Sequence, residues 1–334
     1  MNSIGRSLLR GLLQPFFRPY VSMPGASFAG RPTAFGEDEK KLQSALSSHV
    51  RALAQDIGVR HDTVDGSLAA AVGYIAQSFR AIGFVPRLEA FTFRAMTMHN
   101  VEAIIPGRDP RAPWIVFGAH YDTVKQTRGA DDNASGVAAL LELARLLKDS
   151  RPERTICFVA YANEEHNGGA FENMGSFAHA RGLRATGVKV KAMLALEMLG
   201  YFDPAEGSQK YPFPFNLFYP TRGDFIGFVG NTHSASLVRF VVRQFRSCAQ
   251  IGSEGVAAPE RFADIARSDH WSYWQHGWPA LMVTDTSNFR NPNLHTSGDT
   301  PESLDYQSMT RVVLALSRVA RDLDSTQGAG FDFV

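Results

Sequence analysis

The stretch from Gly118 to Gly136 reads GAHYDTVKQTRGADDNASG and concentrates residues that can do chemistry. His120 and Asp122 come at the end of a short apolar run, Trp114 to Ala119, which is typical of a buried strand. Side chains alternate along a strand, so His120 and Asp122 can project to the same side. A metal-binding imidazole usually donates its other N–H to a carboxylate. The pair therefore predicts a metal ligand, His120, that Asp122 orients, although a His-x-Asp pair alone is more often structural.

Asp131 and Asp132 follow in a loop, and residues 133–136 (NASG) open a helix. Apolar positions with the spacing of one helical face come next, at Val137, Leu140, Leu141, Ala144 and Leu147. Strand, acidic loop and helix in this order place oxygen ligands at the carboxyl edge of a sheet, where α/β proteins build their sites. The alternative is that the aspartates only cap the helix.

Further acids and a histidine stand at the ends of other apolar runs. The candidate ligands and catalytic groups are His120, Asp131, Glu164, Glu165, Glu197 and His295. Buried like charges repel one another and shift their pKa values unless cations neutralise them. Imidazole and carboxylate together suit zinc. The set predicts two divalent metal ions with one bridging carboxylate; a metal-free polar network is the alternative.

The adjacent pair Glu164 and Glu165 is the most informative part of this set. Neighbouring side chains on an extended segment point in opposite directions, so both should not serve one metal ion equally. One of them can bind metal while the other accepts a proton from water that the metal ions activate. This arrangement is typical of a metal-dependent hydrolase.

The elements that must position these residues alternate along the chain. Helices are expected over 37–56, 66–82, 135–148, 174–181, 234–246 and from about 301 or 304 to 323. Strands are expected over 84–94, 100–105, 114–119, 154–161, 191–196, 224–230 and 280–284, the first two as an antiparallel edge. This order predicts one α/β domain, a three-layer α/β/α sandwich around a mixed, mostly parallel sheet. The Pro-rich, aromatic segment 201–224 is expected to form one wall of a substrate cleft or to cover the core.

Composition bounds the class of protein. The chain has 334 residues, is 44% hydrophobic and has a formal net charge of +1, which is ordinary for a globular protein and gives no hint of a nucleic-acid partner. Two cysteines make no disulfide framework. No apolar run is long enough to span a membrane, so the catalytic part is expected to be soluble. The compartment stays open, with the cytoplasm slightly favoured over export.

Residues 1–36 differ from the rest, because they contain four arginines and no acid before Glu37. Leucines and phenylalanines at helical spacing suggest a basic amphipathic segment for a membrane surface, or a targeting segment. The alternative is an arm that packs on its own domain or on a partner subunit. Pro15 and Pro19 are expected to limit any helix to short pieces. We therefore predict a basic extension over 1–36 and a catalytic domain over 37–334.

With the motifs GAHYD, GADDNASG, NEE, LEMLG and HTSGDT in hand, residues 95–320 resemble the aminopeptidase Y family of zinc exopeptidases. That family includes bacterial di-zinc aminopeptidases, glutamate carboxypeptidases and glutaminyl cyclases. The resemblance implies the zinc-exopeptidase fold and two zinc ions, held by His120, Asp131 (bridging), Glu165, Glu197 and His295. It also implies Glu164 as general base, Asp122 as the carboxylate that orients His120, and a cis peptide between Asp131 and Asp132.

One position departs from the pattern, since the family's peptidases commonly have aspartate where this chain has Glu197. The leading expectation is an aminopeptidase acting on peptides or small amides. A carboxypeptidase, with substrate carboxylate recognition by an arginine among Arg222, Arg261, Arg267 and Arg290, or another amidohydrolase stays open. Acyl transfer by a one-zinc glutaminyl cyclase and a non-catalytic binding module are less consistent with a complete ligand set.

Overall fold

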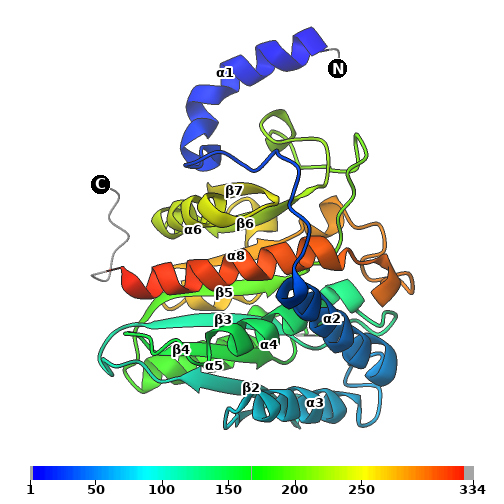
Figure 1. Cartoon of the computed structure of the whole chain (residues 1–334), viewed down its shortest axis with the longest axis vertical. Coiled ribbons are helices and arrows are strands. Elements are labelled where there is room, and N and C mark those ends of the chain that lie inside the picture. Colours follow the sequence, from blue (N-terminus) through cyan, green and yellow to red (C-terminus); the bar gives the residue numbers. More distant parts are fainter. Residues whose placement is uncertain (1–2, 167, 327–334) are drawn as a thin grey trace.

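The computed structural model describes residues 3–166 and 168–326 and contains one eight-stranded mixed sheet (Figure 1). The strand order is β1-β2-β4-β3-β5-β8-β6-β7. The strands are β1 (Arg87–Phe93), β2 (Met96–Ile105), β3 (Trp114–His120), β4 (Ile156–Tyr161), β5 (Val190–Glu197), β6 (Phe225–Asn231), β7 (Gly252–Ala258) and β8 (Ala280–Thr284). The predicted α/β class and mixed sheet are confirmed.

The centre of the sheet consists of the parallel strands β4, β3, β5 and β8. Their residues are almost all buried on both faces, which explains why they read as continuous apolar runs in the sequence. The β1–β2 pair forms an antiparallel edge, as expected from its alternating pattern. The other edge contains β7, a strand with two glycines and few large apolar residues that the sequence did not predict.

Helices cover both faces of the sheet and complete the three layers (Figure 1). The larger core packs under α2 (Glu37–Arg51), α3 (Ser67–Ile82), α4 (Gly136–Leu147), α6 (Ala235–Cys248) and α8 (Tyr306–Ser325). The opposite face is covered by α5 (Gly175–Ala185), α7 (His270–Trp274) and part of the aromatic segment 201–224. Both cysteines are free, and Cys157 is buried in β4.

The chain changes direction across the sheet at β3. After β3 it runs through α4 to β4 on one side, and then through α5 to β5 on the other side of β3. In parallel α/β sheets, connections that leave neighbouring strands in opposite directions open a crevice outside the carboxyl ends of those strands. The fold therefore makes the end of β3, at His120, the natural place for a site.

The N-terminal extension contains a long helix, α1 (Ser3–Val21), that projects from the body of the protein (Figure 1). The expectation of short helical pieces is wrong, because Pro15 and Pro19 both lie inside α1. The helix bends in Figure 1, as interior prolines require, since each removes a backbone hydrogen bond. Phe17 stacks on Phe218, so part of the extension packs on its own domain. None of the helices within 3–166 and 168–326 is long and apolar enough to cross a membrane.

Candidate active site

Two groups of histidine and carboxylate side chains meet at Asp132. In the first, His120 Nε2 lies 3.3 Å from Asp132 Oδ1 and 3.2 Å from Glu197 Oε2. In the second, His295 Nε2 lies 3.0 Å from Asp132 Oδ2 and 2.9 Å from Glu165 Oε1. Within each group, the potential ligand atoms all lie within 4.8 Å of one another. The two carboxylate oxygens of Asp132 thus face different histidines, which is the geometry of a bridging ligand.

The sheet supplies most of this arrangement. His120 is the last residue of β3 and Glu197 the last residue of β5, the neighbouring parallel strand. Glu164 and Glu165 follow β4, the other neighbour of β3. His295 comes from the loop after β8. Four of the five predicted metal ligands therefore meet at one edge of the sheet.

The fifth predicted ligand, Asp131, belongs to neither of these two groups in the structure. Its Oδ1 accepts a hydrogen bond from the Gly200 N–H at 2.9 Å, and its Oδ2 accepts one from Asn291 Nδ2 at 2.7 Å. Asp132 takes its place between the histidines. The cis peptide also lies one residue later than expected, between Asp132 and Asn133. Consecutive side chains in this turn point in opposite directions, so a shift of one residue exchanges a ligand for a buried supporting group.

Asp122 connects the two glutamates to His120. Its Oδ1 and Oδ2 accept hydrogen bonds from the backbone N–H groups of Glu164 and Glu165, both at 3.1 Å. His120 Nδ1 lies 3.6 Å from Asp122 Oδ1 and 3.2 Å from the Asp122 carbonyl oxygen. The backbone of Asp122 thus offers the nearer acceptor for the imidazole, and its carboxylate mainly holds the loop after β4.

Several supporting residues were not recognised from the sequence. Asp299 accepts hydrogen bonds from the backbone N–H groups of Asp131 and Asp132, at 2.8 and 3.2 Å. The Ser268 hydroxyl donates to Glu197 Oε2 at 2.7 Å. Asp299 stands inside the HTSGDT motif that the sequence had singled out, but the motif does not say which ligand this residue supports.

Arg60 is a further supporting residue for which the sequence offered no signal. It is fully buried, and its guanidinium donates to the carbonyl oxygens of Tyr121, Arg128 and Gly129. These carbonyls begin and end the loop that joins His120 to the aspartates. Burial lowers the pKa of Arg60 to about 10, so its guanidinium still carries a positive charge near the acids at neutral pH. Arg60 therefore fixes the path of the ligand-bearing loop.

The site holds more negative charge than its histidines can balance. Burial and, after it, the neighbouring charge of Asp132 raise the pKa of Glu165 to about 8. Burial also raises the pKa of Glu164 well above its usual value. For Asp132 burial acts in the same direction, but the neighbouring imidazoles of His120 and His295 outweigh it and hold the pKa far below its usual value. Added positive charge would let all of these carboxylates ionise.

The residues present fit a pair of divalent metal ions. Asp132 Oδ1 is buried and has no hydrogen-bond partner, which is costly unless another group takes up its lone pairs. Each histidine–carboxylate group provides one imidazole nitrogen and oxygens from two acids, a donor set that suits zinc. Asp132 belongs to both groups, so it would bridge the two ions.

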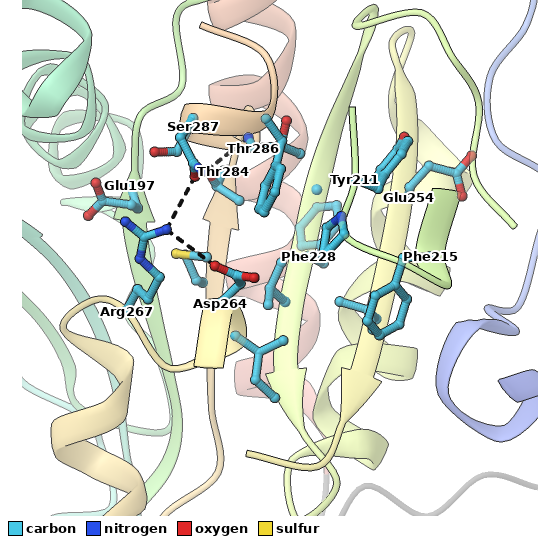
Figure 2. Close-up of a pocket in the computed structure, with 18 of the residues that line it drawn as sticks. Glu197, Tyr211, Phe215, Phe228, Glu254, Asp264, Arg267, Thr284, Thr286 and Ser287 are labelled. Atoms are coloured by element: carbon cyan, nitrogen blue, oxygen red, sulfur yellow. Dashed lines mark hydrogen bonds and ion pairs between the residues drawn. The ribbon is translucent and has the colours of Figure 1, made fainter. Parts of the chain in front are cut away.

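A cavity of about 220 Å³ opens beside these groups (Figure 2). Its polar end is formed by Asp132, Glu164, Glu165, Glu197 and His295. Its apolar walls include Tyr211, Pro212, Phe215, Tyr219, Phe228, Val256, Phe262 and Met282. Figure 2 shows Glu197 and Arg267 toward one end and Tyr211, Phe215 and Glu254 toward the other. The aromatic segment 201–224 thus contributes one wall of the cavity.

Among the four arginines considered for carboxylate recognition, Arg267 lines this cavity. Its guanidinium already lies 3.3 Å from Asp264 Oδ1 and 3.3 Å from the Asn288 side-chain oxygen (Figure 2). Arg290 is buried and donates to Gln209 Oε1 at 2.7 Å. Arg222 is paired with Glu206. These pairings leave the polar end of the cavity dominated by carboxylates.

Comparisons with known proteins agree with this geometry. Residues 100–320 match the model of peptidase family M28. The chain is 40% identical to the uncharacterised protein YfbL of Escherichia coli strain K12, over 80% of this chain and 84% of that protein. It is 32% identical to leucine aminopeptidase 1 of Trichophyton equinum, over 63% of this chain but only 54% of that longer protein.

The fold is also similar to that of BSAP, a zinc aminopeptidase from Bacillus subtilis, with a TM-score of 0.64 and 14% identity, over 86% of this chain and 97% of that one. This likeness concerns the fold alone. The family match spans most of the chain and includes every strand end that carries a candidate ligand. The chain therefore belongs to peptidase family M28 and is a metallopeptidase.

Proposed function

We propose that this peptidase is an aminopeptidase that releases N-terminal residues from peptides at a two-zinc site. The observation that carries the proposal is the shared position of Asp132 between two histidine–carboxylate groups, beside Glu164 and at the end of an apolar cavity. The named relative that is a leucine aminopeptidase supports the same activity.

His120 and Glu197 would hold one ion, Glu165 and His295 the other, and Asp132 both. When bound, the two ions supply Lewis acidity, which lowers the pKa of water and polarises a peptide carbonyl. The protein contributes the fixed ligand positions. Ser268 orients Glu197, and Asp299 holds the backbone on both sides of the Asp131 carbonyl.

Glu164 is the proposed general base. It lines the cavity next to the ligand Glu165, and Asp122 fixes the backbone of both residues. Glu164 would accept a proton from the attacking water and return it to the departing amine. This role requires an ionised carboxylate, and the positive charge at the loaded site would lower the pKa that burial raises in the protein alone.

The charge of the cavity favours a substrate with a free amine. Six acids line the cavity: Asp132, Glu164, Glu165, Glu197, Glu254 and Asp264, of which the first four form its polar end. A cationic N-terminal amine is attracted by this end, whereas a C-terminal carboxylate would be repelled. The apolar walls then favour a large apolar side chain on the first residue, because burying such a side chain contributes about 1.5–3 kcal/mol.

One observation favours a second candidate, a carboxypeptidase, since Arg267 lines the cavity and its side chain is half exposed. In that case Arg267 would give up its hydrogen bonds to Asp264 and Asn288 and bind the substrate carboxylate instead. N-terminal and C-terminal blocking of the same dipeptide distinguishes the two activities.

The experiment compares leucyl dipeptides with free ends, with an acetylated N-terminus and with an amidated C-terminus, using zinc-loaded protein. An aminopeptidase cleaves the free and amidated forms and spares the acetylated form. Cleavage of the acetylated but not the amidated form would replace the proposal by a carboxypeptidase. Glu164→Gln, with unchanged zinc content, is expected to lower the rate of whichever cleavage occurs by about 10²- to 10⁴-fold.

A further inference from the structure

A second meeting of histidine and aspartate lies outside the proposed catalytic centre. His61 and Asp62 come from the loop before α3, and His166 comes directly after Glu165. Their potential ligand atoms all lie within 4.8 Å of one another. Asp62 Oδ2 is 3.6 Å from His166 Nε2, and ligand atoms of four-coordinate zinc lie about 3.3 Å apart, given bonds of about 2.0–2.1 Å. The three side chains are thus spaced nearly as one metal ion requires.

The contact between His61 and Asp62 is unfavourable without a cation. The Thr63 N–H donates to His61 Nδ1 at 3.1 Å, and the Thr63 hydroxyl lies 2.9 Å from the same nitrogen, so this nitrogen directs its lone pair toward Thr63. Asp62 Oδ1 lies 2.9 Å from the same nitrogen and has no hydrogen-bond partner. Two lone-pair atoms at this distance repel unless a positive centre lies beside both. A cation that binds here would coordinate His61 Nδ1 in place of the hydrogen bond from the Thr63 N–H.

The side chains border a small cavity of about 10 Å³, room for one ion or one water molecule. Asn163 and Asp122 also line it. The side-chain oxygen of Asn163 is buried and, like Asp62 Oδ1, has no hydrogen-bond partner. Two unpartnered buried oxygens at one cavity are unusual, because nearly all such atoms in proteins are satisfied. A bound cation would satisfy both oxygens together with the two imidazoles, one of which, His166, has the Arg94 guanidinium 3.4 Å from its Nε2.

A different cluster of possible metal ligands serves as an internal comparison. Glu102, Cys157 and His179 also lie within metal-binding distance of one another. There, however, His179 bonds to Glu102 at 2.9 Å through Nε2 and to the Tyr273 hydroxyl at 2.7 Å through Nδ1. The protein itself satisfies that cluster, so spacing alone does not indicate a metal site. What distinguishes the His61 cluster is its unpartnered oxygens, Asp62 Oδ1 and Asn163 Oδ1.

We infer that His61, Asp62 and His166, with the Asn163 side-chain oxygen at the same cavity, form an additional divalent-cation site suited to zinc. The ion would join the loop before α3 to the loop that carries Glu164 and Glu165. His166 is 38% exposed, which gives the ion a path from solvent. The ion's role would be to hold this second loop in place. It would add to Asp122, which accepts hydrogen bonds from the backbone N–H groups of Glu164 and Glu165.

The test counts zinc in untagged protein dialysed to equilibrium against buffered zinc. His166→Ala and Asp62→Ala are each expected to bind about one ion per chain fewer than wild type. His233→Ala, at an exposed histidine away from this cluster, is the control and should match wild type. The comparison is a difference, so it does not depend on how many ions the catalytic centre binds, and a failure of the proposed aminopeptidase activity leaves it unaffected.

Equal zinc content in wild type and His166→Ala would overturn the inference and would assign the cavity to water. If Asp62→Ala does not fold, His166→Ala decides alone, because its partly exposed side chain leaves no buried gap. A second readout is thermal unfolding. Zinc should raise the unfolding midpoint of His166→Ala less than that of wild type, and an identical rise in both would also contradict the site.

Discussion

The Asp132 group (His120, Asp132, Glu165, Glu197 and His295) and the Glu102 group (Glu102, Cys157 and His179) contain similar residue types at similar distances. In the Glu102 group, Arg87 donates to both carboxylate oxygens of Glu102 at 2.9 and 3.0 Å, and His179 donates a further bond. In the Asp132 group an oxygen of Asp132 stays unpartnered, and burial raises the pKa of Glu165 to about 8.

This difference in hydrogen bonding distinguishes a polar network that stabilises the fold from a group that can bind a metal ion. Fixed cationic donors balance the buried Glu102, and burial is outweighed by bonds from His179 and Arg87, so the pKa of Glu102 falls to about 2. The Asp132 group contains more carboxylates than histidines, and it borders a cavity. A buried cluster that is short of positive charge and reachable from solvent can use a metal ion, whereas a satisfied one stabilises the fold.

The largest expected effect comes from the general base. Glu164→Gln should lower kcat for a leucyl dipeptide by about 10²- to 10⁴-fold, because proton transfer in the transition state is lost. Zinc content should stay the same, since Glu164 belongs to neither ligand group. Glu172→Gln, at an exposed position of the same loop, is the matched control. Activity of the Glu164 variant close to wild type would remove Glu164 from the mechanism.

The next effect distinguishes the adjacent aspartates. Asp132→Asn should weaken zinc binding by more than the roughly 10- to 100-fold that follows from changing a residue that only supports a ligand. Asp131→Asn should stay within that range, because Asp131 bonds to Gly200 and Asn291. Zinc affinity measured with a competing chelator tests both. Equal losses, or a larger loss for Asp131→Asn, would contradict the bridging position of Asp132.

A smaller effect is expected in the Glu102 group, and on stability instead of activity. Glu102→Gln weakens charge-assisted bonds from Arg87 and His179 and should lower the free energy of unfolding by about 1–3 kcal/mol. Urea unfolding measures this loss, and zinc content and kcat should match wild type. A loss of zinc in this variant would mean that the two clusters do not differ in the way proposed.

The smallest effect is the pH dependence of that loss. The pKa of Glu102 is lowered from 4.5 to about 2 in the folded protein, so its stabilisation is fully present above about pH 4.5 and disappears as the pH falls through about 2. The difference in unfolding free energy between wild type and Glu102→Gln should therefore shrink across this window. A constant difference between pH 5 and pH 2 would show that Glu102 acts through packing and not through its charge.

Local pattern was sufficient for much of the fold and of the site. The short apolar runs before His120 and Glu197 are typical of fully buried strands, and in the structure their ends coincide with the sheet edge. The helical periodicity after Gly136 likewise produced α4. Strand β7 escaped detection, because Ser253, Glu254 and Gly255 carry no strand pattern and their pairing with β6 is a long-range contact.

The kinds of ligand and the strand ends that carry them could be predicted from the amino-acid sequence, because both depend on residue type and on short-range periodicity. Tertiary structure decided which aspartate faces the histidines: Asp299, Gly200 and Asn291 hold Asp131 away, and none of these contacts is visible along the chain. It also brought His61 and Asp62 beside His166. Side-chain direction in an irregular turn is set by distant partners, so no local pattern encodes it.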